Sequence, residues 1–147
     1  MEETKIVSAS TVIAAPAETI FEQIADPARQ PVWDGNANLA EAPTGQRVHA
    51  VGDVFVMVLT KDGVRRDNHV VEFEEGRLIA WRPSEQGSTP PGHLWRWELR
   101  PLDDGRTEVT HTYDWTDLTD EARLPRARRT TGDRLQDSLN RLAALFG

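Results

Sequence analysis

The feature that most constrains the fold is a run of side chains, from about residue 50 to residue 116, that alternates between apolar and polar. A period of two is typical of strands with one buried face. The stretch HLWRWELRP (residues 93–101) shows it clearly, with His93, Trp95, Trp97 and Leu99 on one face and Leu94, Arg96, Glu98 and Arg100 on the other. Gly63, Gly76 and Gly105 each follow an acidic residue between such runs, as in tight hairpin turns. The pattern predicts an antiparallel meander with strands near residues 51–60, 64–76, 77–84, 93–101 and 107–116.

The remaining segments predict one more strand and three helical pieces. Residues 5–13 are rich in β-branched side chains and predict a first strand. Pro16 favours the start of a short amphipathic helix in residues 16–26, and a second helical turn is predicted to end near Trp33. Residues 130–147 carry the longest helical stripe, which consists of Leu135, Leu139, Leu142 and Phe146. This closing helix has to bury its stripe, and the aromatic face of the sheet is the available partner.

Counting by two assigns an unusually aromatic set of side chains to the inner face of the sheet. The inward set is His69, Val71, Phe73, Ile79, Trp81, His93, Trp95, Trp97, Leu99, Val109, His111, Tyr113 and Trp115. Two interpretations of this face stay open. The tryptophans either pack directly against the closing helix, or they line an apolar cavity that carries a few polar groups, as ligand pockets do.

Composition narrows the class of protein. A chain of 147 residues fits a single domain, here taken as residues 1–147. The absence of cysteine excludes disulfides, thiolate metal sites and cysteine nucleophiles. The N-terminus has no apolar signal region, and no run is long enough to cross a membrane, so we expect a cytoplasmic location. A net charge of −7 argues against nucleic acid as a partner.

One basic segment departs from this acidic balance. RLPRARR (residues 123–129) contains Arg123, Arg126, Arg128 and Arg129. Charge runs of this kind are commonly a solvated helix face or loop. The alternative is a basic rim that attracts an anionic ligand or a partner protein.

The order of elements, together with four local stretches, resembles the START and polyketide cyclase-like (SRPBCC, Bet v-type) superfamily. The stretches are TVIAAPAETIFEQIADPARQPVWDG, VVEFEEGRLIAWR, WRWELRPLDDGRTEVTHTYDW and DRLQDSLNRLAALF. The resemblance implies an α+β helix-grip fold, in which a curved seven-stranded antiparallel sheet surrounds a long C-terminal helix and two short helices follow the first strand. It also implies a cavity between sheet and C-terminal helix that accepts hydrophobic molecules. Fold does not settle function, since members of the superfamily include carriers, cyclases and partner-binding proteins.

The favoured hypothesis is therefore binding or transport of a lipid-like or polyketide-like molecule. The predicted ligand contacts are His69, Phe73, Trp81, His93, Trp95, Trp97, His111, Tyr113, Trp115, Leu135 and Leu139. An alternative is a polyketide cyclase, aromatase or dehydratase, for which His111 and Tyr113 are the candidate catalytic residues because they could exchange protons with a polyketone. A further alternative is a partner-binding module, such as a toxin–antitoxin component. No metal or cofactor is expected, and a homodimer is a possibility.

Overall fold

The computed structural model of the protein describes residues 4–34 and 39–146. Its strands are β1 (Ile6–Ile13), β2 (Leu39–Glu41), β3 (Val54–Leu59), β4 (Arg65–Glu74), β5 (Leu78–Glu85), β6 (Leu94–Pro101) and β7 (Thr107–Asp114). Its helices are α1 (Ala17–Ala25), α2 (Gln30–Trp33), α3 (Leu124–Arg129) and α4 (Gly132–Ala144), with 3-10 turns η1 (Pro27–Arg29) and η2 (Glu121–Arg123). Residues 1–3, 35–38 and 147, which include Gly35 and Gly147, lie outside the described residues.

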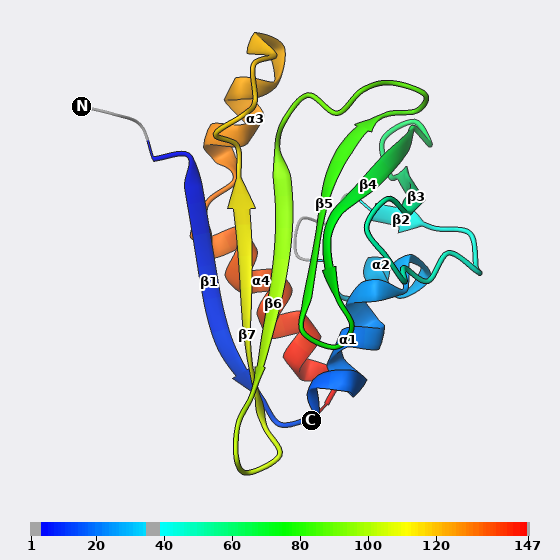
Figure 1. Ribbon diagram of the computed structural model, residues 1–147. Coiled ribbons are helices and arrows are strands. Elements are labelled where there is room, and N and C mark those ends of the chain that lie inside the picture. Colours follow the sequence, from blue (N-terminus) through cyan, green and yellow to red (C-terminus); the bar gives the residue numbers. More distant parts are fainter. Residues whose placement is uncertain (1–3, 35–38, 147) are drawn as a thin grey trace.

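The described strands form one seven-stranded sheet in the order β1-β7-β6-β5-β4-β3-β2, and every neighbouring pair is antiparallel (Figure 1). Strand β1 pairs with β7, so the start of the chain closes against the end of the meander. The predicted α+β fold class and the predicted meander are confirmed. The meander runs from β2 to β7, and the alternation of side chains predicted five of these strands, β3 to β7. It did not predict the short strand β2, which precedes them.

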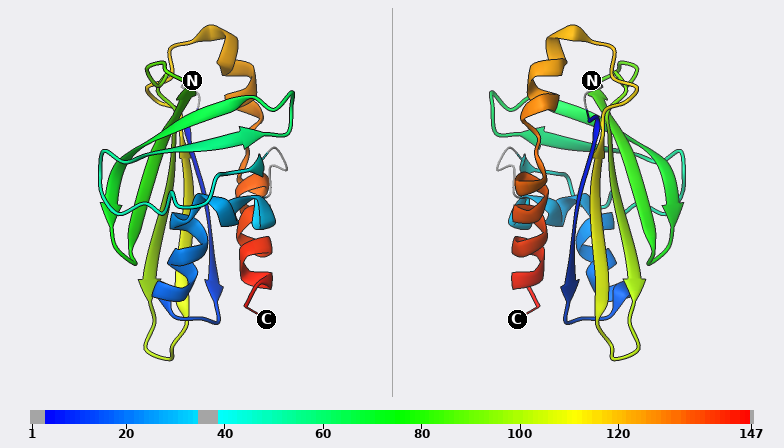
Figure 2. Two further views of the ribbon diagram at one scale, coloured as in Figure 1. Left: turned by 90° about the vertical axis from the view of Figure 1, so that its right-hand side faces the viewer. Right: turned by 90° about the vertical axis from the view of Figure 1, so that its left-hand side faces the viewer.

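Helices α1, α2 and α4 lie against one face of the sheet (Figure 2). Helix α4 packs on β1 and β7 with Leu135, Leu139 and Leu142, which are almost fully buried. Helix α1 packs on β6 and buries Ile20, Phe21 and Ile24. The long helix therefore covers one side of the sheet rather than its centre, where the tryptophans of β5 and β6 lie.

A bulge in β4 changes which side chains point inward. Val70 pairs with Trp81 whereas Glu72 pairs with Ala80, so Val71 is one residue extra between them. An extra residue reverses the alternation on one side of the bulge. The predicted inward orientation of His69 and Val71 is therefore wrong, because this counting by two crossed the bulge. His69 instead lies beside Ser84, with 3.1 Å between His69 Nε2 and Ser84 Oγ.

The inner face of the sheet has two unlike ends. At the end near α1, which we call the α1 end, Phe21 meets Phe73 edge-on with ring centroids 5.7 Å apart. Trp33 meets Trp97 in the same manner at 5.2 Å. These rings form a continuous core with Ile79 and Leu99. At the opposite end, the α3 end, the short helix α3 covers the sheet (Figure 1).

Within the described residues, no helix is long and apolar enough to span a membrane.

Candidate functional site

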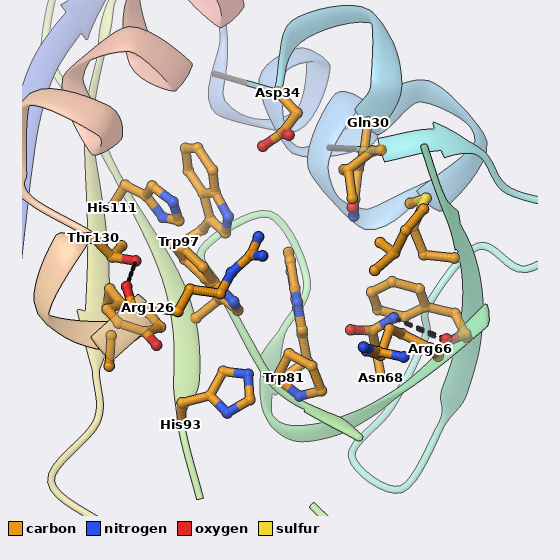
Figure 3. Close-up of a pocket in the computed structure, with 18 of the residues that line it drawn as sticks. Gln30, Asp34, Arg66, Asn68, Trp81, His93, Trp97, His111, Arg126 and Thr130 are labelled. Atoms are coloured by element: carbon orange, nitrogen blue, oxygen red, sulfur yellow. Dashed lines mark hydrogen bonds between the residues drawn. The ribbon is translucent and has the colours of Figure 1, made fainter. Parts of the chain in front are cut away.

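A cavity of about 190 Å³ lies at the α3 end, between the inner face of the sheet and helices α2 and α3 (Figure 3). Its apolar wall consists of Trp33, Leu39, Phe55, Met57, Leu59, Trp81, Pro83, Trp95, Trp97, Leu118 and Ala127. Its polar and charged lining consists of Gln30, Asp34, Arg66, Asn68, His93, His111, Tyr113, Arg123, Arg126 and Thr130. The site is thus a mainly aromatic and aliphatic container with several groups that can form hydrogen bonds.

Six of the eleven predicted ligand contacts come together in this lining. They are Trp81, His93, Trp95, Trp97, His111 and Tyr113. They come from three neighbouring strands, β5, β6 and β7, and from the residue directly before β6. Their contact with a ligand stays a prediction.

The other five predicted contacts lie outside the cavity lining. His69 lies on the outer side of the bulged strand, and Phe73 packs into the α1 end against Phe21. Trp115 and Leu135 belong to a separate buried cluster, and Leu139 lies in the main core. Trp115, Leu135 and Leu139 lie outside the lining because α4 covers β1 and β7 and does not border the cavity. The cavity therefore lies beneath α2 and α3, not between the sheet and the C-terminal helix as the resemblance implied.

His111 is fixed by its neighbours. Its ring stacks on Trp97 with centroids 3.7 Å apart and lies nearly parallel to Trp95 at 5.5 Å. Its Nδ1 lies 3.1 Å from the carbonyl oxygen of Arg96, and because a carbonyl only accepts, Nδ1 carries the proton. Burial lowers the pKa of His111 to about 3. The ring is therefore neutral near pH 7, with the lone pair of Nε2 left to accept a hydrogen bond.

His93 lies at the α3 end of the cavity with an unused ring nitrogen. Its Nδ1 is buried and has no hydrogen-bond partner among the described residues. Burial, together with the positive charges of Arg123, Arg126, Arg82 and Arg66, lowers the pKa of His93 to about 4. This imidazole is also neutral near pH 7, and its Nδ1 is available to a ligand.

The loop before His93 is held by the side chain of Arg82 and by a close approach of Gly92 to the backbone of Asp117. Arg82 Nη1 donates to the carbonyl oxygen of Gly92 at 2.6 Å, and Arg82 Nη2 pairs with Asp117 at 3.2 Å. Gly92 has a φ of +127°, and a Cβ at this position would lie 2.1 Å from the carbonyl oxygen of Asp117. Only glycine fits here, so the sequence fixes the loop and with it the ring of His93.

Tyr113 and two amides complete the uncharged polar lining. The ring of Tyr113 lies 4.4 Å from that of Trp95, and burial raises the pKa of Tyr113 to about 12, so the hydroxyl stays protonated. Gln30 Nε2 donates to the carbonyl oxygen of Ile24 at 2.9 Å, and Asn68 Nδ2 donates to that of Phe55 at 3.3 Å. These bonds orient the amides and leave their carbonyl oxygens available as acceptors.

The residues described here contain no group of three or more histidine or acidic side chains that could hold a metal ion. The chemistry available to the cavity is stacking on tryptophan and tyrosine rings, hydrogen bonding from neutral imidazoles, a phenol and amides, and attraction by arginines. That combination suits recognition of a small molecule whose surface is largely apolar.

Comparison with known proteins agrees with this geometry. The profile of a family described as "Polyketide cyclase / dehydrase and lipid transport" matches residues 4–147. The chain belongs to this family.

Two curated relatives of this member of the polyketide cyclase / dehydrase and lipid transport family come from Mycobacterium tuberculosis. The chain is 32% identical over 111 residues to the uncharacterized protein Rv0088 of Mycobacterium tuberculosis, a match that covers 74% of this chain and 47% of that protein. The chain thus spans about half the length of the curated relatives it matches.

Solved structures share the fold at low sequence identity. Protein MLL2253 from Mesorhizobium loti superimposes with a TM-score of 0.67 at 17% identity, covering 95% of both chains. Protein Ms6760 from Mycobacterium smegmatis gives 0.66 at 17% identity, covering 97% of this chain and 90% of that one. The Aha1 dimer from Colwellia psychrerythraea gives 0.64 at 16% identity, covering 97% and 96%. These likenesses establish the helix-grip architecture of the family and nothing finer.

Several lining residues of this family member were missed by sequence reasoning. Arg66 and Asn68 share the inner face of β4, and recognising the bulge at Val71 would have identified them. Trp33 was predicted only as the end of a helical turn, yet it forms part of the cavity wall. Arg123 and Arg126 belong to the basic segment that was interpreted as a solvated face or a basic rim, and they lie at the rim of the cavity.

Proposed function

We propose that the protein binds a compact hydrophobic small molecule in the cavity at the α3 end. The observation that carries this proposal is the cavity itself, whose aromatic wall faces several polar side chains. Among them is the buried Nδ1 of His93, which has no hydrogen-bond partner within the described residues. Aromatic rings that border a cavity gain dispersion contacts when a fitting apolar molecule fills it. The family description, which includes lipid transport, supports the same assignment.

The size of the cavity supports a small ligand. Its volume of about 190 Å³ is below the roughly 300–1,000 Å³ of pockets that enclose drug-sized molecules. A bicyclic ring system or a single medium-length acyl chain matches this space better than a two-chain lipid. The parallel rings of Trp95 and His111 favour a flat body that can stack against them.

Native mass spectrometry of the freshly purified chain tests the proposal. We expect the mass of a bound molecule smaller than a typical drug-sized ligand, and this mass should disappear under denaturing conditions. Ala127 is buried at the cavity wall on α3, so Ala127→Phe should fill the cavity and remove the bound mass. Ala122→Phe, at an exposed site in the preceding turn, is the matched control and should keep it. A folded wild-type protein that carries no mass and binds no apolar probe would contradict the proposal.

The cyclase alternative depends on proton transfer by His111 or Tyr113. Both line the cavity, but a general acid or base works best when its pKa lies near the working pH. A pKa of about 3 makes His111 a weak base, and a pKa of about 12 makes Tyr113 a weak acid. These values support binding over catalysis. Turnover of a polyketone that is abolished by Tyr113→Phe, in a variant that still folds, would reverse this preference.

The partner-binding alternative concerns α3 and its flanks. Arg128 and Arg129 are exposed and do not line the cavity, so they form the part of the basic segment that could meet a protein. Co-purification of a partner whose binding weakens with salt would support this function. A homodimer likewise stays a prediction, which sedimentation of the full chain would test.

A further inference from the structure

The α3 end of the cavity carries more positive than negative charge. Three of its described lining residues are arginines, and Asp34 is the single acid among them. The chain as a whole has a net charge of −7. A local excess of cations in an acidic protein is therefore a property of this site and not of the surface in general.

The three arginines are not equally neutralised by the protein. Arg123 pairs with Asp120 at 3.2 Å and with Glu85 at 3.3 Å. Arg66, on the inner face of β4, forms no ion pair and no side-chain hydrogen bond within the described part of the chain. It is half-buried, and burial and the nearby Arg123 and Arg126 lower its pKa. Partial burial of this guanidinium without an ion-pair partner raises the free energy of the folded protein, and a bound anion would offset that cost.

Two further groups point to the same end. The Nδ1 atom of His93 is buried without a partner among the described residues, and the imidazole is neutral, so it can donate one hydrogen bond. The side chain of Arg126 extends from α3 into the space between His93 and Trp97 (Figure 3). The apolar wall of Trp81 and Trp95 adjoins these groups in the same lining.

We infer that the ligand is an amphipathic acid, with a carboxylate held by Arg66, Arg126 and His93 and an apolar body against Trp81 and Trp95. This inference rests on the proposed function, because it names the class of molecule that fills the same cavity. A carboxylate matches the planar fork of a guanidinium with two parallel hydrogen bonds. Its single charge suits a site where part of the positive charge is already offset, by Asp34 in the lining and by Glu85 and Asp120, which pair with Arg123.

Matched acids and amides test the inference, because each pair differs only in charge. The probes are 2-naphthoic acid with 2-naphthamide, and decanoic acid with decanamide, titrated into the full chain by calorimetry. We expect at least one acid to bind about tenfold more tightly than its amide at low salt. The affinity of that acid should fall several-fold as salt is raised, while the affinity of the amide stays constant.

Two neighbouring arginines on β4 supply the variant and its control. Arg66→Gln removes the inward guanidinium and should erase the preference for the acid while leaving the affinity for the amide unchanged. Arg65→Gln alters the adjacent, exposed side chain on the outer face and should keep the preference. If Arg66→Gln does not fold, the salt titration of the wild-type chain decides the question.

The outcomes separate the inference from the function on which it rests. Amides that bind as tightly as their acids would overturn the carboxylate and leave a neutral-ligand pocket intact. Failure of every probe to bind would overturn both proposals. Inorganic phosphate that competes as well as the acids would assign the arginines to a free anion and also overturn the inference.

Discussion

The two ends of the inner sheet face are built from the same strands and differ in what covers them. Strand β6 contributes Trp95 and Trp97, which lie two positions apart on one face and both border the cavity. Trp97 also packs against Trp33 in the core at the α1 end. Trp97 is 1% exposed and belongs to the core, whereas Trp95 is half-buried. Alternation alone treats these two tryptophans as equivalent.

The covering helices account for the difference. Helix α1 inserts Ile20, Phe21 and Ile24, all completely buried, and fills the space above the sheet. Helix α3 has six residues, of which Ala127 is the one that is buried. A short helix that fully buries one methyl group, and packs Leu124 only partly against its neighbours, does not fill the space above the aromatic surface. In this molecule the sheet supplies the same kind of wall at both ends, and the length and side-chain volume of the covering helix decide whether the space is core or cavity.

The sharpest test of this comparison removes one phenyl ring from each end. Phe21→Ala should lower the free energy of unfolding by about 3–5 kcal/mol, because Phe21 is fully enclosed and its loss leaves a new cavity. Phe55→Ala, at the cavity wall, should lower it by less than about 3 kcal/mol, because that ring already borders empty space. Urea unfolding of the two variants measures both changes. Equal losses would show that the two ends are packed alike.

Gly92 and Gly87 lie in the same loop at the α3 end and test how rigidly that end is held. Both have positive φ, but a Cβ at Gly92 would meet the backbone of Asp117 at 2.1 Å, whereas at Gly87 nothing lies within 4 Å. Gly92→Ala should therefore cost about 2–3 kcal/mol and displace His93. Gly87→Ala carries the backbone strain alone, about 1–2 kcal/mol. If thermal unfolding finds the two variants equally stable, the contact with Asp117 does not fix the loop.

The architecture was predictable from sequence because alternation and glycine turns are local signals. Trp95 and Trp97 on β6, and His111 and Tyr113 on β7, were assigned to the inner face from spacing, and the structure places them there. The resemblance to a known family supplied the seven-stranded sheet and the two short helices after the first strand, and the structure contains both. Alternation can be recognised from sequence because the residues of each strand alone specify which of its sides is apolar.

The position of the cavity could not be predicted in this way. A cavity remains where the side chains of the covering helices do not fill the space between helix and sheet. Its position therefore depends on segments that are far apart in sequence. The bulge at Val71 has no glycine or proline to mark it, so counting by two assigned His69 to the wrong face and did not identify Arg66 as a lining residue. The short helix α3 is below the length at which a helical stripe is recognisable, so Arg126 appeared only as part of a charge run.

Lowering the pH should reduce the free energy of unfolding, because neutral imidazoles are buried beside the cavity. Burial lowers the pKa of His111 to about 3 from the value of 6.5 that applies in the unfolded chain. The stability from keeping this ring neutral is therefore fully present above about pH 6.5. It is lost as the pH falls from there toward 3, by about 1.4 kcal/mol per pH unit. His111→Gln does not titrate, so its urea midpoint should fall less steeply than that of the wild type between about pH 6.5 and 5. Parallel profiles would mean that folding does not lower the pKa of His111.

Arg123 gives the smallest expected effect and separates binding from folding at the α3 end. Its partners Glu85 and Asp120 are exposed, and ion pairs with exposed carboxylates stabilise proteins by about 0–1 kcal/mol. Arg123→Ala should therefore change the unfolding free energy by less than about 1 kcal/mol, far below the loss expected for Phe21→Ala. The same substitution removes one cation from the rim and should weaken binding of an acidic probe while sparing its amide. A large loss of stability would show that the α3 end stabilises the fold as the α1 end does, which would contradict the comparison.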